Sequence, residues 1–423
     1  MSLPRNDIRT LPSATAGPAL DRLLYIVDTA LAGTRAGLMA VPSAGAIYPY
    51  ECFLIAAHGT DSATLFALDL PRPTCRAVLS GGELLAAVRA TGIETNLAVL
   101  VLSRPWLSMR KYGDRGYLYT QLDTAHAVGN IALATEAHDG AAEIRHRPVS
   151  SGLRATLGPL ADCREIHSVV AVDVHGVLPA THGWQVLDAR SVASPAPHWQ
   201  ERANWHSLGE DVADRSDGPR SMTLSPALGP VLPQPPRFSL DLFGARRSAS
   251  AFVEATVAAQ TVAEVFRHTA VPLAGDIPAD TGITATAVLR DVSPGSTGEV
   301  VDARRIAIDG DDVTTACMGQ HHLRAASVVV LVHAPRSSLT TGLGTVLMRA
   351  GIFGQLLYLG ATAAGLGVTG VGGFDSTSWR QFAGLPADHD VVYVLALGVA
   401  ADDGEKADRD PVPYAGQVNA DAR

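Results

Sequence analysis

The spacing of apolar residues predicts an alternation of helices and strands. Between residues 19 and 32, apolar side chains recur every three or four positions, as they do on one face of a helix. Tyr119–Glu136 and Gly342–Ala364 are longer and largely uncharged, which predicts two long helices buried on most sides. Shorter apolar runs predict strands. In the first 175 residues these strands are Glu51–Ala57, Thr64–Leu70, Leu97–Leu102 and Ser168–Val174, with a helix at Gly82–Ala90.

The same order of predicted elements returns in the second part of the chain. Helix, loop, strand, strand, helix, strand, long apolar helix and final strand follow one another in both parts. The later elements, besides the long helix, are Val257–His268, Gly282–Leu289, Ala303–Ile308, Asp312–Gly319, Ala326–His333 and Val391–Val399. This repetition indicates an internal duplication. It predicts an α+β fold in which two similar halves pack through their long apolar helices.

A segment of different character separates the halves. Residues 176–238 are rich in Pro, Ser, Asp and Trp and show no sustained apolar period. A structureless stretch of this length is unusual inside one domain, so it predicts a connector that docks at points along its path. We therefore expect a first domain over residues 1–175, the connector over 176–238 and a second domain over 239–423.

Composition narrows the function classes. The 423-residue chain has a net charge of -9 and no basic block, which argues against a nucleic-acid partner because phosphate neutralisation needs clustered Lys and Arg. The four cysteines lie far apart, and His321-His322 have no third ligand in sequence, so we expect no metal site. The N-terminus lacks a signal-peptide pattern, and glycines interrupt the uncharged span 350–374. We expect a cytoplasmic protein that does not enter a membrane.

Short motifs in both halves carry the candidate chemistry. The loop Pro42–Pro49 reads Pro-Ser-Ala-Gly-Ala-Ile-Tyr-Pro, and its small residues offer backbone N–H groups to a flat ring or a phosphate. Alone it would be a tight turn before a strand. Lys111-Tyr112-Gly113 follows in the same half. Arg246-Arg247-Ser248 opens the second half, and Gly365–Phe374 near its end contains five glycines.

In this order, the motifs and the helix start Leu122–Asn130 resemble the SagB-type branch of the nitroreductase superfamily. Those proteins are FMN-dependent dehydrogenases that oxidise azolines in thiazole/oxazole-modified peptides. The resemblance covers both halves and leaves out the connector and the tails. It implies a nitroreductase-like fold for each half, with FMN held where two such units meet. One unit supplies an arginine, a serine, a glycine loop and C-terminal basic residues, and the other supplies the Pro-Ser-Ala-Gly loop.

Carried over residue by residue, the resemblance is asymmetric. The first half keeps the loop residues Pro42, Ser43, Ala44 and Gly45 and the pair Lys111 and Tyr112. The second half keeps the cofactor-binding positions Arg246, Ser248, Gln320, Gly370, Val371, Gly372 and Gly373, with Lys406 and Arg409 after its last strand. Leu273 stands where a second loop serine would be, and the first half has no Arg-Arg-Ser. The resemblance therefore implies a fused pseudo-dimer with one working FMN site.

The retained residue types suit this chemistry. Arg246 and Ser248 are two apart, so on an extended segment both face one phosphate. Azoline oxidation removes a proton from one ring carbon and a hydride from its neighbour, so it requires a base beside the substrate. The resemblance assigns Lys111 as that base, with Tyr112 sharing or relaying the proton. His126 and Asn130 are one helical turn apart and are expected to satisfy a buried helix interface.

Three functions are compatible with the sequence. The first is an FMN-dependent dehydrogenase that converts a thiazoline or oxazoline to an azole in a ribosomally made peptide, with oxygen reoxidising the flavin. The second is an NAD(P)H-dependent nitroreductase or quinone reductase, which would not require a dedicated base. The third is a non-catalytic scaffold subunit that binds precursor peptide or cyclodehydratase partners. The Lys111-Tyr112 pair, in the same half as the Pro42–Pro49 loop, favours the first.

Overall fold

The computed structural model describes residues 17–32, 38–69, 74–148, 151–174, 185–187, 227–278 and 281–401. Its helices are α1 (Gly17–Leu31), α2 (Gly82–Arg89), α3 (Pro105–Tyr112), α4 (Arg115–Ala137), α5 (Ser151–Leu157), α7 (Leu240–Ala245), α8 (Ala259–His268), α9 (Gly310–Ala316), α10 (Arg336–Ala363) and α11 (Ser376–Ala383). Its strands are β1 (Tyr50–His58), β2 (Ser62–Asp69), β3 (Thr74–Gly81), β4 (Leu97–Ser103), β5 (Ala141–His146), β6 (Glu165–Asp173), β7 (Gln185–Leu187), β8 (Ala274–Gly275), β9 (Thr284–Leu289), β10 (Asp302–Arg305), β11 (Val328–Pro335), β12 (Gly367–Val371) and β13 (His389–Gly398).

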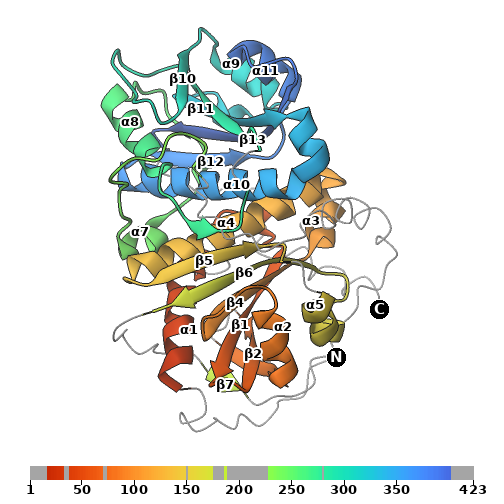
Figure 1. Cartoon of the computed structure of the whole chain (residues 1–423). Helices are drawn as coiled ribbons and strands as arrows, with labels where there is room; N and C mark the ends of the chain where they lie inside the picture. Colours follow the sequence, from red (N-terminus) through yellow and green to blue (C-terminus); the bar gives the residue numbers. More distant parts are fainter. Residues whose placement is uncertain are drawn as a thin grey trace, which may run out of the picture.

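The strands form two sheets, and α4 and α10 lie between them (Figure 1). The first sheet has the order β7-β3-β2-β1-β4-β6-β5-β8, and the second has the order β10-β9-β11-β13-β12. The α+β fold with two halves packed through long apolar helices is confirmed. Its long helix α10 is apolar enough to cross a membrane, but 89% of its most apolar window is buried inside the protein.

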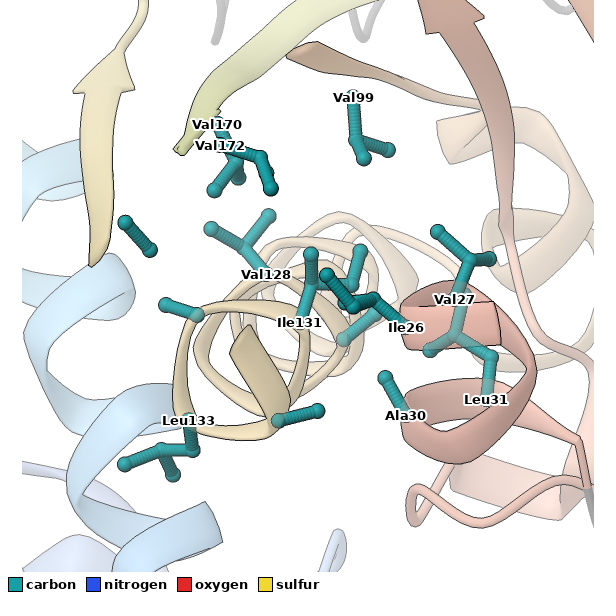
Figure 2. Packing of buried hydrophobic residues seen from close by; sticks show 14 of the residues in the cluster. Ile26, Val27, Ala30, Leu31, Val99, Val128, Ile131, Leu133, Val170 and Val172 are labelled. Carbon is teal, nitrogen blue, oxygen red and sulfur yellow. The ribbon is translucent and has the colours of Figure 1, made fainter. Parts of the chain in front are cut away.

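The central strand of the first sheet shows why its sequence is a continuous apolar run. Val99 and Val101 of β4 face a core shared with α1 and α4, whereas Ala98 and Leu100 face a second core beneath α2 and α5. Both faces are covered, so alternation with polar residues is absent. Figure 2 shows the first of these cores, where β4 and β6 meet α1 and α4. The labelled side chains there are Ile26, Val27, Ala30, Leu31, Val99, Val128, Ile131, Leu133, Val170 and Val172.

The two halves are joined by β-strand pairing as well as by the packing of α4 on α10. β8, from the second half of the sequence, pairs in parallel with β5 at the edge of the first sheet. The opposite edge is closed by β7, which comes from the predicted connector and pairs in parallel with β3. Residues 185–187 of the predicted connector therefore lie against the first sheet. Most of the segment 176–238 lies outside the described residues.

Small residues let α4 and α10 approach closely. A β carbon on Gly351 of α10 would lie 2.5 Å from Cβ of Ala125 and 2.7 Å from the carbonyl oxygen of Leu122, both on α4. At the same crossing, Gly129 of α4 faces Ile352, whose Cγ1 would lie 3.3 Å from an added β carbon. The glycines in these helices therefore reflect close packing between the halves.

Sequence prediction failed where pairing or capping decides the local structure. Gly370 and Val371 were expected in a glycine loop, but they belong to β12, where Gly370 pairs with Leu395. The helix predicted at Asp312–Gly319 is observed at Gly310–Ala316. It begins earlier because Asp309 caps its N-terminus by accepting hydrogen bonds from the backbone N–H groups of residues 311 and 312. The runs that form β3, α3, β5 and α11 were not recognised.

Overpacking the α4–α10 crossing should destabilise the protein. Gly351→Ala places a methyl group within 3 Å of two α4 atoms, at a cost of about 1–3 kcal/mol. Alanine has a higher helix propensity than glycine, which offsets up to ~1 kcal/mol of this cost. We expect a net loss of about 1–2 kcal/mol in urea unfolding. Gly342→Ala, at the non-helical kink near the start of α10, with no atom within 4 Å of the added methyl group, serves as the control for a glycine without close contacts. An equal stability for both variants would contradict close packing at this crossing.

Candidate active site

The Pro42–Pro49 loop is fixed to α4 by one buried carboxylate. The hydroxyl of Ser43 donates to Oδ2 of Asp123 at 2.6 Å, and the backbone N–H of Ala44 donates to the same oxygen at 3.0 Å. The Ser43 hydroxyl also accepts from the backbone N–H of Tyr48 at 2.9 Å. Gly45 follows with φ +63°, a left-handed conformation that favours glycine. These hydrogen bonds fix the backbone conformation of the Pro42–Pro49 loop.

Burial decides the protonation of Asp123. It raises the pKa of this carboxyl to about 7, against opposing hydrogen bonds from Ser43 and Ala44 that lower it. The group thus titrates near neutral pH. It lies in an otherwise largely apolar helix interior, and its role here is to hold the loop.

The catalytic candidates Lys111 and Tyr112 lie against this loop. They end helix α3, which starts with Pro105 in its first turn and stops at Gly113, whose φ is +59°. A β carbon on Gly45 would lie 2.5 Å from the Tyr112 hydroxyl oxygen and 3.0 Å from Nζ of Lys111. Lys111 and Gly45 are exposed, so this side of the site is open to solvent. The structure brings the two motifs of the first half together.

Side chains from α4 and from the second half hold the glycine segment that follows β12. The hydroxyl of Tyr119 donates to the carbonyl oxygen of Gly372. Nη2 of Arg115 donates to the carbonyl oxygen of Phe374 at 3.0 Å, and Nε2 of Gln320 donates to that of Gly373 at 2.7 Å. Successive carbonyls of residues 372–374 are therefore fixed. Tyr119 and Arg115 come from the first half, so these bonds join the halves at the site.

Arg246 connects the halves in the opposite direction, from a second-half side chain to first-half backbone. This guanidinium is buried, although it belongs to the second half, and Nε donates to the carbonyl oxygen of Ala40 just before the loop. Nη1 lies 3.4 Å from the hydroxyl of Ser248. Ser248 is 3.3 Å from the Tyr358 hydroxyl, which accepts from the backbone N–H of Gly370 at 2.7 Å. The Arg246–Ser248 pair is thereby linked to the first-half loop on one side and to β12 on the other.

A buried hydrogen-bond network lies at the same interface, between α4 and α10. Nδ1 of His126 lies 2.9 Å from Oε1 of Gln355, and Nε2 lies 3.0 Å from the Tyr393 hydroxyl. Gln355 continues the network by donating to Oδ1 of Asn130 at 2.7 Å. Burial lowers the pKa of His126 to about 3, so the ring is neutral at physiological pH. The expectation that His126 and Asn130 satisfy a buried helix interface is confirmed.

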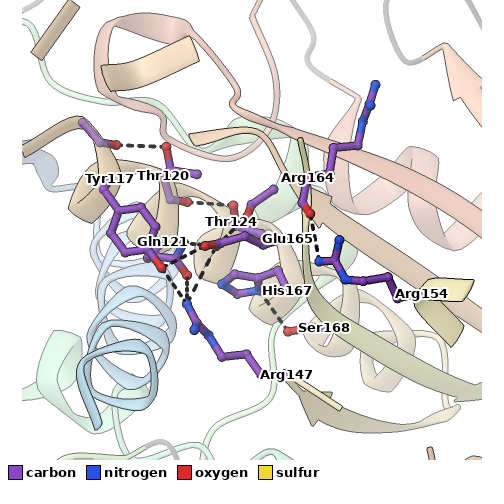
Figure 3. A network of polar contacts seen from close by, with 12 residues as sticks. Tyr117, Thr120, Gln121, Thr124, Arg147, Arg154, Arg164, Glu165, His167 and Ser168 are labelled. Atoms are coloured by element: carbon purple, nitrogen blue, oxygen red, sulfur yellow. Dashed lines mark hydrogen bonds and ion pairs between the residues drawn. The ribbon is translucent and has the colours of Figure 1, made fainter. Parts of the chain in front are cut away.

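A second polar network occupies another part of the α4 surface (Figure 3). Nη2 of Arg147 donates to the Tyr117 hydroxyl and to Oε1 of Gln121, each at 3.0 Å. The same nitrogen lies 3.8 Å from Oε2 of Glu165. Arg147 follows β5 directly and has φ +46°. A β carbon on Gly344 of α10 would lie 2.6 Å from its Nε, so the arginine side chain fills the space beside α10.

The described structure thus gathers most of the sequence-predicted site residues at one place between the halves. Lys406 and Arg409 lie outside the described residues. The sequence predicts no role for Asp123, Tyr119 or Tyr358. Asp123 is a charged residue within a long, largely uncharged helix, which is a local signal, whereas Tyr119 carries none. Tyr358 lies within the apolar run of α10 and carried no such signal.

Comparison with known proteins supports the fold. Residues 244–399 match the nitroreductase family model. A presumed nitroreductase from Anabaena variabilis is similar over 93% of this chain and 90% of its own, with 19% identity and a TM-score of 0.65. A presumed nitroreductase from Desulfovibrio desulfuricans, solved in complex with FMN, matches 42% of this chain and 93% of its own, with 19% identity and a TM-score of 0.29. No curated protein matched.

Titration of Asp123 should make stability depend on pH. The ordinary pKa is 3.8 and the folded value is about 7, so the folded state retains the proton more strongly. The associated stability is complete below about pH 4 and is lost as pH rises to about 7. We expect Asp123→Asn to flatten Tm between these values, whereas Asp388→Asn, at an exposed carboxylate, should leave the wild-type slope. Thermal unfolding at several pH values checks this, and parallel profiles for both variants would refute it.

Proposed function

We propose that this chain, whose residues 244–399 match the nitroreductase family model, is an FMN-dependent dehydrogenase that oxidises azolines in a ribosomally made peptide. The observation that carries the proposal is that complementary motifs from the two halves meet in one place. Arg246 of the second half bonds the backbone beside the Pro42–Pro49 loop, and Lys111 and Tyr112 of the first half touch that loop at Gly45. Neither half contains both sets.

The residues present fit FMN in their chemistry. A buried guanidinium beside a serine hydroxyl, Arg246 with Ser248, is a donor set suited to a phosphate monoester. Glycines at 370, 372 and 373 leave Val371 as the one side chain in residues 370–373, which favours close approach of this backbone to a planar ring. The Pro42–Pro49 loop offers a second surface of small residues. Lys406 and Arg409 are further phosphate ligands in the proposal.

Different residues of the chain have different roles in the proposed azoline oxidation. When bound, FMN supplies the acceptor for the hydride that leaves one ring carbon, and oxygen regenerates it. Lys111 accepts the proton from the neighbouring ring carbon at Nζ, and Tyr112 shares it through its hydroxyl. Asp123 keeps the loop in place through Ser43 and Ala44. The substrate loses two hydrogen atoms in total, and the ring becomes aromatic.

Exposure of the site supports a peptide substrate. Gly45 and Lys111 are exposed, and Tyr112 is half-buried, so a ring carried on a long chain can reach the base from outside. A reductase that takes electrons from NAD(P)H would not require a lysine at this position. A scaffold subunit would not require the buried arginine–serine pair. The proposal therefore accounts for residues that these two alternatives leave without a role.

The same structure supports one FMN per chain. β5 precedes β6 in the first half as β12 precedes β13 in the second, and both pairs are antiparallel neighbours. Gly372 follows β12, whereas the corresponding position after β5 is Arg147. The Arg147 side chain, bonded to Tyr117 and Gln121, occupies a position at which the other half has no side chain. A second cofactor would have to displace this network.

Removal of Arg246 should weaken FMN binding. Charged hydrogen bonds contribute about 1.5–3 kcal/mol, so Arg246→Ala should lower affinity roughly 10- to 100-fold, and Arg246→Lys less. The neighbouring Arg247 is exposed and donates to the carbonyl oxygens of Gly244 and Arg246, so Arg247→Ala is the matched control. Flavin fluorescence titration of the apoprotein measures both. A colourless wild-type protein that does not bind FMN would contradict the proposed cofactor.

Removal of Lys111 should separate binding from chemistry. Lys111→Ala should retain FMN but lower turnover by about 100-fold or more, because the proton acceptor is lost. Arg110→Ala, at the exposed preceding position of α3, should turn over normally. The assay is mass spectrometry of a thiazoline-containing peptide, which loses two hydrogen atoms on oxidation. Full activity of Lys111→Ala would remove the proposed base. Rapid flavin bleaching by NADPH alone, without peptide oxidation, would favour the reductase.

A further inference from the structure

We propose that Tyr119 is a positioning residue that fixes the Lys111–Tyr112 end of α3 over the glycine segment after β12. This proposal rests on the proposed function for its catalytic consequence. The physical link itself is visible in the structure: the Tyr119 hydroxyl donates across the halves to the carbonyl oxygen of Gly372, and its ring meets Tyr112 edge to face at 5.0 Å between centroids. One side chain therefore contacts both a catalytic candidate and the cofactor-binding segment.

The surroundings show why the contact needs a phenol. α3 ends at Tyr112, and Lys111 and the following Gly113 are exposed, whereas the half-buried ring of Tyr112 meets Tyr119. A β carbon on Gly372 would lie 3.2 Å from Cζ of Tyr119, which places the ring directly against the glycine. Burial raises the pKa of the Tyr119 hydroxyl above its ordinary value. The hydroxyl therefore stays protonated and donates throughout the physiological pH range.

A second cross-half bond strengthens the same junction. Arg115, one turn before Tyr119 on α4, donates to the carbonyl oxygen of Phe374 at 3.0 Å, and its guanidinium lies 5.4 Å from the centre of the Phe374 ring. Tyr119 and Arg115 thus hold the carbonyls of residues 372 and 374 from the first half. The Tyr119 ring also meets Tyr112 of α3, so this residue connects the end of α3 with the segment after β12.

The consequence for the reaction is geometric. Proton removal and hydride removal occur at adjacent atoms of one ring, so the base and the hydride acceptor must face that ring in a fixed relation. Loss of the Tyr119 hydroxyl removes the hydrogen bond to the carbonyl oxygen of Gly372 but leaves the base and the hydride acceptor present. Turnover then falls while flavin and substrate still bind.

Tyr119→Phe and Tyr117→Phe form a matched pair for the test. The hydroxyl of Tyr117, two residues away on α4, bonds Glu165 and Arg147 in the network of Figure 3 and not the glycine segment. We expect Tyr119→Phe to lower kcat about 10- to 100-fold, with KM and FMN content within twofold of wild type. Tyr117→Phe should keep kcat. Arg115→Ala, at an exposed position, should lower kcat several-fold.

Hydrogen exchange gives a readout that does not depend on activity. In protein as purified, Tyr119→Phe should speed exchange at residues 105–113 and 372–376, whereas Tyr117→Phe should not. Unchanged exchange in these segments would overturn the proposal, and so would unchanged kcat in an active wild type. A fall in FMN content equal to that of Arg246→Ala would also overturn it, because Tyr119 would then be a binding residue. If the wild type oxidises no azoline, the proposed function fails, and exchange alone decides the role of Tyr119.

Discussion

The close crossing of α4 and α10 is the constraint on which the rest of the structure depends. Each helix is too apolar to face water, and each covers the sheet of its own half, so burial requires the other helix. Glycine at 351 and at 129 removes the side chains that would hold the helices apart. The site follows from this geometry, because α4 carries Asp123, Tyr119 and Arg115 to the boundary and α10 leads into β12. A shift of one helix along the other would separate the loop from the glycine segment.

Polar groups inside that crossing set its register. Apolar contacts alone tolerate sliding, whereas the series Tyr393, His126, Gln355 and Asn130 is satisfied only when each donor meets one acceptor. Gln355 donates to Asn130 through Nε2, which leaves Oε1 to accept from Nδ1 of His126. Nε2 of the neutral ring then accepts from the Tyr393 hydroxyl. Tyr393 reaches to 2.5 Å from where a β carbon on Gly370 would lie, so the network ends against β12.

The sequence predicts the elements of the fold more completely than the residues of the candidate site. Apolar periodicity located α1, α4, α10 and the central strands because burial on one or both faces leaves a pattern in a single segment. It missed β3, β5 and β12, whose strand character comes from neighbours in the sheet and not from their own residues. At the site, Lys111, Tyr112, Arg246 and Ser248 belong to short motifs that can be read locally. Tyr119 and Tyr358 act through partners about 250 and 110 residues away, and no local pattern indicates them.

The asymmetry between the halves agrees with the proposal that two similar units are joined in one chain. In a symmetric dimer, one substitution alters both sites, so neither can be filled without losing the other. In one chain the two positions vary independently, and the residue after β5 is Arg147 whereas the residue after β12 is Gly372. Arg147 obtains partners from Tyr117, Gln121 and Glu165, which converts an open position into a buried network that joins β5, β6 and α4. The hydroxyl of Tyr117 belongs to this network, whereas the hydroxyl of Tyr119 bonds Gly372 of the other half. The two halves therefore use neighbouring tyrosines of α4 for separate contacts.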